Sequence, residues 1–281
     1  LHSAVMEALC PYLWLFQKSN GSSRAHGGNG DDEEALTTAM RKRTRAIHDV
    51  SDKLVNAKLL MAFSDRKAYG DAVSHFYYIF DAIERHLELN KHENGLKNIA
   101  TFLSIMSRAE RMKSDLRYFL GADWKPDIKS MPESVRKYVA YIEELSRERP
   151  ICLLPYLYHN WMAILAGGQI IRRLATHGMG LPSGNGVSMF AFDGETRASL
   201  KRRFKASVCS IKLDSETRKQ VLDESAKVFV QNNLVIRTAR MRISKSAQAK
   251  AICKCGTMLA GIAGGTIILI LGVAHVAISC L

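Results

Sequence analysis

The stretch RKRTRAIHDVSD, residues 41–52, places a histidine and a carboxylate at a spacing suited to metal binding. Asp52 follows His48 by four residues, about one turn of an α-helix. At that separation the carboxylate can accept a hydrogen bond from one imidazole nitrogen and leave the other nitrogen free to bind a metal ion. A surface or capping histidine at the end of a basic helix fits the same spacing, so spacing alone leaves both interpretations open.

A second stretch, LAGGQIIRR at 165–173, places Gly167 and Gly168 side by side in an apolar helical pattern. Each glycine inside a helix costs about 1 kcal/mol relative to alanine, so the pair requires a structural reason. Either the helix crosses another helix closely at this point, or it lies flat against a planar ligand. The segment alone favours the helix crossing and leaves the ligand as the second interpretation.

A third group of residues could bind two carboxylates on one edge of a ligand. Lys201 and Lys205 are one helical turn apart, and Arg41 and Arg45 share one face of the helix that carries His48. Most such lysine pairs are simply solvated. Together with the arginines and the hydroxyl of Tyr158, however, they could hold carboxylates through charge-assisted hydrogen bonds.

The elements that must position these residues are predicted to be helices. Between about residues 35 and 240, apolar residues recur every three to four positions, and alternation typical of strands is rare. The pattern predicts one all-α domain whose helices pack around a single core. The predicted helices cover 35–48, 51–62, 66–89, 95–120, 132–148, 151–177, 196–209 and 214–243.

Composition divides the 281 residues into four parts. Residues 1–34 include a Gly/Ser/Asn-rich run and are predicted to be disordered. Residues 35–243 form the all-α domain and 244–255 a basic linker. Residues 256–281 are apolar and long enough to cross a bilayer, which predicts a C-terminal transmembrane tail anchor with the domain in the cytosol. Gly261 and Gly265 form a GxxxG, which fits either a homodimer interface through the tail helix or simply small residues in a lipid-facing helix.

The formal net charge of +13 predicts an anionic partner. Basic residues without acidic ones precede the apolar tail, and that position favours anionic membrane lipids over nucleic acid. These residues are Arg237, Arg240, Arg242, Lys245, Lys250 and Lys254. The six cysteines have no repeating spacing, which argues against a disulfide scaffold. No P-loop, dinucleotide fingerprint, HExxH or GxSxG motif occurs, so the enzyme classes that depend on them are excluded.

Four stretches of the sequence resemble the heme oxygenase family, and its insect members in particular. They are TRAIHDVSDKLVNAKL (44–59), YLYHNWMAILAGGQIIRR (156–173), KRRFKASV (201–208) and DESAKVFVQNNL (223–234). The resemblance extends over about residues 36–240 and the terminal anchor. It implies an all-α domain that holds heme between a proximal and a kinked distal helix.

The resemblance also assigns roles to individual residues. His48 would be the proximal iron ligand, with Asp52 in place of a glutamate that orients the imidazole. Gly167 and Gly168 would be the distal-helix glycines that let the backbone approach the porphyrin. Heme propionates would be held by Arg41, Arg45, Tyr158, Lys201 and Lys205, and the pocket wall would include Phe229 and Asn232.

The implied reaction cleaves heme, both cofactor and substrate, to biliverdin, carbon monoxide and ferrous iron. It consumes O2 and electrons that an NADPH-dependent flavoprotein reductase of the endoplasmic reticulum supplies. The implied location is therefore the endoplasmic reticulum membrane, with the catalytic domain facing the cytosol. Biliverdin reductase is a further partner that the resemblance brings into consideration.

The distal motif departs from the mammalian GDLSGGQ, because this chain has AILAGGQ. Ala163 and Ala166 replace a glycine and a serine, and Ile164 replaces the aspartate that anchors a distal water network. Phe80 stands where a tyrosine supports that network, and Asn160 where an arginine belongs. Since isoleucine and phenylalanine cannot form side-chain hydrogen bonds, we expect slow turnover and relaxed choice of the meso carbon.

Two other functions remain as alternatives. One is a heme-binding sensor or buffer protein at the membrane without productive turnover. The other is a membrane-anchored helical interaction protein that binds no heme. Absorption spectra with hemin distinguish the second from both heme-binding functions, and product analysis with reductase and NADPH distinguishes the enzyme from the sensor.

Overall fold

The structure is a computed structural model that describes residues 34–62 and 65–238. The side chains of residue 49 and of 52–62 lie outside that description. Every regular element in the described ranges is helical, which confirms the predicted all-α class. The α-helices are α3 (Leu36–Ala62), α4 (Arg66–Leu89), α5 (Lys97–Ala100), α6 (Leu103–Met106), α7 (Ala109–Leu120), α8 (Glu133–Glu148), α9 (Leu154–Met162), α10 (Gly168–Met179), α11 (Arg197–Cys209) and α12 (Ser215–Thr238). The shorter elements are η1 (Ile128–Ser130), η2 (Pro150–Leu153), the π-helix η3 (Ala163–Gly167) and η4 (Ser188–Phe190).

Several predicted boundaries were wrong. The helices expected at 35–48 and 51–62 are one continuous helix, α3. Ser51, expected to begin a new helix, instead donates a hydrogen bond from Oγ to Ile47 O at 2.9 Å and stays within the helical turn. The helix expected at 214–243 corresponds to α12, and its predicted end at 243 lies outside the described residues and stays a prediction.

The helix expected at 95–120 is three helices, α5, α6 and α7. The chain becomes extended at Ser107, where ψ is 137°. The following N–H groups of Arg108 and Ala109 donate to the carboxylate of Glu84 at 2.7 and 3.1 Å. A buried carboxylate from α4 therefore satisfies the first N–H groups of α7, and a new helix begins there.

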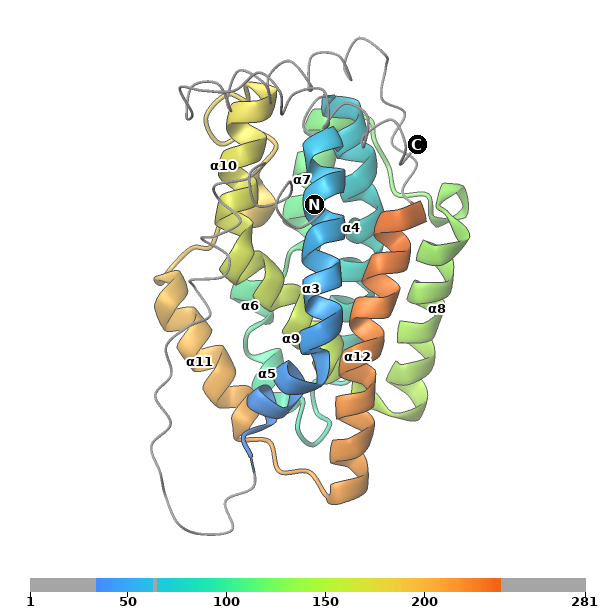
Figure 1. The fold of residues 1–281 in the computed structure, drawn as a ribbon, viewed down its shortest axis with the longest axis vertical. Helices are drawn as coiled ribbons and strands as arrows, with labels where there is room; N and C mark the ends of the chain where they lie inside the picture. The colour runs from blue at the N-terminus through green and yellow to red at the C-terminus, as the bar shows by residue number, and fades with distance from the viewer. Residues whose placement is uncertain (1–33, 63–64, 239–281) are drawn as a thin grey trace, which may run out of the picture. The chain divides into compact units, whose positions relative to one another are not determined.

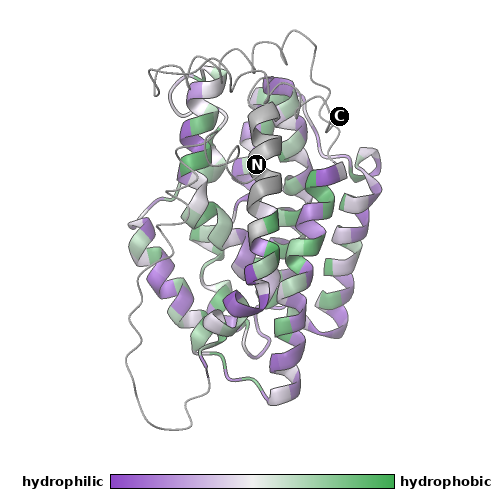
Figure 2. Cartoon of the chain, in the orientation of Figure 1, coloured by the Kyte–Doolittle hydropathy of each residue, from purple (hydrophilic) through white to green (hydrophobic). Residues whose placement is uncertain are grey.

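Helix α4 lies at the centre of the core. It packs against α3, α7, α8 and α9 (Figure 1). Its buried side chains include Ile79, Ile83 and Leu87, all inaccessible to solvent. Figure 2 shows hydrophobic and hydrophilic residues alternating along α8 and α12, as expected for helices that bury one face.

Glu84 also joins α4 to α9, because its Oε1 accepts a hydrogen bond from Trp161 Nε1 at 3.1 Å. Burial raises the pKa of Glu84 to about 7, against the lowering effect of its N–H donors. Arg108 extends the same connection, since its guanidinium donates to the carbonyl oxygens of Met189 and Ala191 at 3.2 and 2.6 Å. The chain around η4 is thus fixed to the start of α7.

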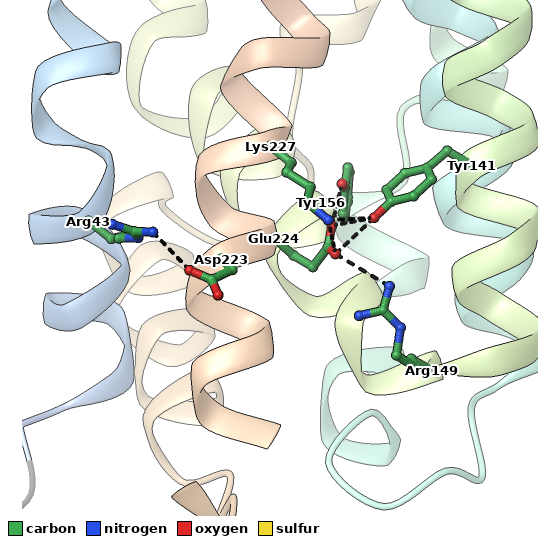
Figure 3. A network of polar contacts seen from close by, with 7 residues as sticks. All are labelled: Arg43, Tyr141, Arg149, Tyr156, Asp223, Glu224 and Lys227. Atoms are coloured by element: carbon green, nitrogen blue, oxygen red, sulfur yellow. Dashed lines mark hydrogen bonds and ion pairs between the residues drawn. The ribbon is translucent and has the colours of Figure 1, made fainter. Parts of the chain in front are cut away.

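Helix α12 is fixed to its neighbours through a buried carboxylate, Glu224 (Figure 3). Its oxygens accept hydrogen bonds from the hydroxyls of Tyr141 on α8 and Tyr156 on α9, at 2.8 and 2.9 Å. Lys227 Nζ lies 2.8 Å and Arg149 Nη2 3.5 Å from Glu224 Oε1. Since all five polar groups converge, α12 has a defined position against α8 and α9.

An exposed ion pair also joins α12 to α3. Arg43 Nη2 lies 2.8 Å from Asp223 Oδ1, and Figure 3 shows the pair on the opposite side of α12 from Lys227. Helices α3 and α12 pack along each other (Figure 1). Residues of α12 are therefore placed next to those of α3.

Within residues 34–62 and 65–238, no helix is both long enough and apolar enough to cross a bilayer. The predicted tail anchor at 256–281, the basic linker at 244–255 and residues 1–33 of the predicted N-terminal segment lie outside the described residues.

Candidate active site

His48 and Phe229, predicted to share a site, are in contact. His48 is exposed on α3, and its ring centroid lies 5.5 Å from that of Phe229 on α12. Asp52 follows one turn later in α3, but its side chain lies outside the description, so its pairing with His48 stays a prediction. An accessible imidazole beside an aromatic wall is suited to binding a flat ligand that contains a metal.

The same phenylalanine contacts a second histidine. The His159 ring on α9 lies 4.9 Å from Phe229, and its Nε2 lies 3.1 Å from Ser225 Oγ on α12. Burial, and secondarily the nearby His48, lowers the pKa of His159 to about 3. The sequence alone gives His159 no role, because its partners come from α12, more than 60 residues away.

The glycine pair lies at the end of a π-helix. Helix α9 passes at Ala163 into η3, and the regular α-helix resumes at Gly168. A π-turn inserts an extra residue into a helix and occurs frequently at functional sites. Ala163 and Ala166 are exposed and Gly167 is partly exposed, so small residues form an accessible face of η3.

Gly168 has a packing requirement of its own. A Cβ atom at this position would lie 2.7 Å from Phe190 Cδ1, closer than van der Waals contact permits. The close approach expected from the sequence therefore exists at Gly168, between α10 and the short helix η4. The expected role of both glycines toward a planar ligand stays a prediction.

Four of the five residues predicted to bind carboxylates lie together. Burial lowers the pKa of Lys205, and the neighbouring charges of Lys201 and Arg41 lower it further. Burial raises the pKa of Tyr158 to about 12, and Arg41 opposes that change. Arg45 is exposed one turn after Arg41 on α3. The structure thus places three cations and a phenol close together, where α3, α9 and α11 meet.

The positions of the expected distal network are largely apolar. Ile164 and Phe80 are buried, with exposed fractions of 8% and 3%. Asn160 is also buried; its Nδ2 donates to Tyr156 O at 2.9 Å, and its Oδ1 accepts from Asn232 Nδ2 at 3.1 Å. The amide pair is thus one of the polar connections between α9 and α12.

One further polar group, the Tyr138 hydroxyl, lies beside this amide pair. The Tyr138 hydroxyl on α8 lies near Asn160, and both it and Asn232 Oδ1 are buried without a hydrogen-bond partner in the described part of the chain. Buried polar atoms of this kind are normally satisfied by ordered water. Tyr138 was missed from the sequence because its position in an amphipathic helix indicates only a core residue.

Comparison with known proteins identifies the family. A family model described as heme oxygenase matches residues 34–238. The chain belongs to the heme oxygenase family. The expected family and the enzyme class, a heme-degrading oxidoreductase, are therefore confirmed. The closer resemblance to insect heme oxygenases stays a prediction.

Curated heme oxygenases align over most of the chain. Heme oxygenase 1 of Gallus gallus is 26% identical over 233 residues, which cover 81% of this chain and 77% of the chicken protein. Heme oxygenase 1 of Nostoc sp. is 25% identical over 226 residues, covering 80% and 90%. The similarity thus covers about four fifths of the chain in both cases.

Solved heme oxygenase structures have the same fold. Heme oxygenase 2 from Chlamydomonas reinhardtii, crystallised without heme, is 32% identical, with a TM-score of 0.71 over 75% of this chain and 100% of that one. Heme oxygenase-1 from Synechocystis, crystallised in complex with heme, is 20% identical with a TM-score of 0.66, covers 81% of this chain and 98% of that one, and supports the fold alone.

The described residues fit heme as the heme oxygenase substrate. His48 presents an accessible imidazole, and Arg41 lies seven residues earlier on the same face of α3, about 10 Å along the helix. That arrangement suits a macrocycle whose metal is bound by His48 and whose carboxylates reach Arg41, Lys201 and Lys205. The accessible alanines of η3 offer a surface without side chains long enough to block a planar ligand.

Proposed function

We propose that this heme oxygenase cleaves heme to biliverdin, carbon monoxide and ferrous iron, using O2 and electrons from an NADPH-dependent flavoprotein reductase. The observation that carries the proposal is the shared face of α3, where the exposed His48 and the exposed Arg41 are separated by two helical turns. A lone surface histidine would not be accompanied by converging cations from α11.

Each part of the site has its own task. His48 binds the iron, and Arg41, Lys201, Lys205 and the Tyr158 hydroxyl bind the two propionates. Bound heme supplies the iron that activates O2 and is also the molecule that is cleaved. The small residues of η3 would leave room for the porphyrin face.

Slow turnover and relaxed meso-carbon selectivity follow from the apolar distal residues. Ile164 and Phe80 are buried and can neither donate nor accept a hydrogen bond, so they exclude water without moving protons. The amide pair of Asn160 and Asn232, with the Tyr138 hydroxyl, is the group best placed to hold water in their stead. We therefore expect mixed biliverdin isomers from this enzyme.

A non-catalytic heme sensor or buffer is the second candidate, and the buried Ile164 is the observation that favours it. Addition of hemin, reductase and NADPH to the purified protein distinguishes the two. Biliverdin with carbon monoxide supports the enzyme, whereas a stable oxygen complex or unselective bleaching supports the sensor. Absence of a Soret band that depends on His48 would contradict both, and would leave the helical interaction protein.

The proposed partners and location rest on the sequence. Residues 256–281 would anchor the protein in the endoplasmic reticulum membrane, and the basic residues before them would meet anionic lipids. The net charge of +13 suits an acidic reductase surface, so raised salt should slow electron transfer. Biliverdin reductase would take the product.

A further inference from the structure

Phe229 is held between two imidazoles that come from different helices. His48 of α3 lies 5.5 Å and His159 of α9 lies 4.9 Å from it, measured between ring centroids. The two ring planes are inclined to that of Phe229 by 51° and 66°, so both contacts are tilted or edge-to-face. Both histidines therefore pack against the same ring. If one histidine moves, Phe229 can move with it, and the packing of the other histidine changes.

His159 is the fixed member of this trio. Its Nε2 lies within hydrogen-bond distance, 3.1 Å, of Ser225 Oγ, and Ser225 is inaccessible to solvent. Ser225 precedes Phe229 by one turn on α12, so the anchor and the contacted ring lie on the same helix face. The Tyr158 ring lies 5.2 Å from His159 on α9 and further restricts it.

Burial constrains Phe229 only in part and His48 hardly at all. Phe229 is only partly buried, and His48 is exposed. Burial alone therefore does not fix the rotamer of either ring. A ring packed against His159 on one side gives His48 a defined wall, whereas the same ring without His159 has space to turn toward α9.

We propose that His159 is a positioning residue for the iron ligand: held by Ser225, it fixes Phe229, and Phe229 contributes to the orientation of the His48 imidazole alongside the contact predicted for Asp52. The inference rests on the proposed function in that His48 is taken to bind heme iron. His159 acts through packing and does not itself contact the iron. Groups that orient a metal-binding histidine influence metal affinity strongly even without touching the metal.

The proposal predicts a graded series of variants of the full chain, each titrated with hemin. His159→Ala removes the ring, and we expect hemin affinity to fall about tenfold. We also expect broadened electron paramagnetic resonance signals of the ferric protein, since those signals depend on the imidazole plane. His159→Phe keeps a ring of similar size and loses only the bond to Ser225, so its affinity should remain within about threefold of wild type.

Two controls separate positioning from general destabilisation. His177→Ala removes an exposed histidine of α10 and should leave hemin affinity and spectra unchanged. Thermal unfolding without hemin identifies any variant that fails to fold, and if His159→Ala does so, Ser225→Ala carries the test with a smaller loss of affinity. Wild-type affinity and spectra in His159→Ala, or equal losses in His159→Phe and His159→Ala, would overturn the proposal.

The proposed function fails in a different way. If His48→Ala binds hemin with the wild-type spectrum, His48 is not the ligand and the heme site itself is misassigned. If His48→Ala loses the Soret band but His159→Ala behaves as wild type, the heme site stands and only the positioning role is wrong.

Discussion

Gly168 and Phe190 meet so closely that a single methyl group would not fit between them: an added Cβ would lie 2.7 Å from the ring. We expect Gly168→Ala to lower the free energy of unfolding by about 1–3 kcal/mol, because the Phe190 ring must move. Urea unfolding of the hemin-free protein measures this change.

A smaller side chain at 190 provides the matched control. Phe190→Leu alone should destabilise through the space it leaves. The double variant Gly168→Ala/Phe190→Leu should be more stable than the sum of the two single effects predicts, because the new methyl group occupies that space. Simple additivity would indicate that the glycine is needed for another reason.

Removal of Lys205 should affect binding and stability in opposite directions. Burial, Lys201 and Arg41 lower the pKa of Lys205, which means that its charge is unfavourable in the folded protein. Lys205→Ala should therefore slightly increase the free energy of unfolding. Hemin affinity should fall about tenfold, since a charge-assisted hydrogen bond to a carboxylate contributes about 1.5 kcal/mol.

Arg202 on the same helix is exposed and serves as the comparison. Arg202→Ala should leave hemin affinity close to wild type. If both substitutions weaken binding equally, the effect is one of general charge and the carboxylate site at Lys205 is wrong.

Two neighbouring carboxylates of α12 should differ widely in their importance. Glu224 is 1% exposed at its side chain and accepts hydrogen bonds from Tyr141, Tyr156 and Lys227. Glu224→Leu leaves these buried partners without an acceptor and should cost about 3 kcal/mol. Asp223→Asn breaks an exposed pair with Arg43 and should cost less than about 1 kcal/mol. Chemical denaturation of the two variants tests the contrast, and similar losses would contradict it.

The pH dependence of the free energy of unfolding should reveal the lowered pKa of His159. Its pKa is lowered from 6.5 to about 3, so the native ring stays neutral where the unfolded ring takes up a proton. Above pH 6.5 this difference does not reduce the free energy of unfolding. As the pH falls from 6.5 toward 3, the unfolded ring takes up a proton and the free energy of unfolding decreases, by at most about 1.4 kcal/mol per pH unit. Wild type should therefore lose more stability between pH 7 and pH 5 than His159→Phe does.

An exposed histidine provides the reference for that comparison. His92→Gln should lose as much stability on acidification as wild type does. A His159→Phe variant whose denaturation midpoint changes with pH in the same way as wild type would show that the ring is protonated in the native protein.

Periodicity predicted the helical class because apolar residues at helical spacing are a property of each segment alone. The same pattern could not reveal the interruption at Ser107, since the carboxylate that starts α7 comes from Glu84 on another helix. The sequence also does not predict the π-helix before Gly168, because the glycines indicate a less stable helical segment but not how its backbone adjusts.

The site residues show the same distinction between what a residue indicates by itself and what depends on its neighbours in the fold. His48 and the cations were predicted because imidazole and charged side chains indicate their chemistry directly, whereas Phe229 was implied only by the family resemblance. His159 and Tyr138 were missed because their significance depends on α12 and α9 packing beside them. Asp52 remains a prediction, since its side chain is outside the description.

The bond from Trp161 to Glu84 has a mechanical consequence. This hydrogen bond joins α9 to α4 two residues before the π-helix η3 begins at Ala163. Arg108 holds the chain next to η4 through its hydrogen bond to Ala191 O. A backbone adjustment on substrate binding would then be concentrated in η3, between Trp161 and the start of α10, where Gln169 Nε2 donates to Phe190 O at 2.8 Å. Tyr158, which precedes this segment, would keep its place beside Arg41 while η3 adapts its shape to the ligand.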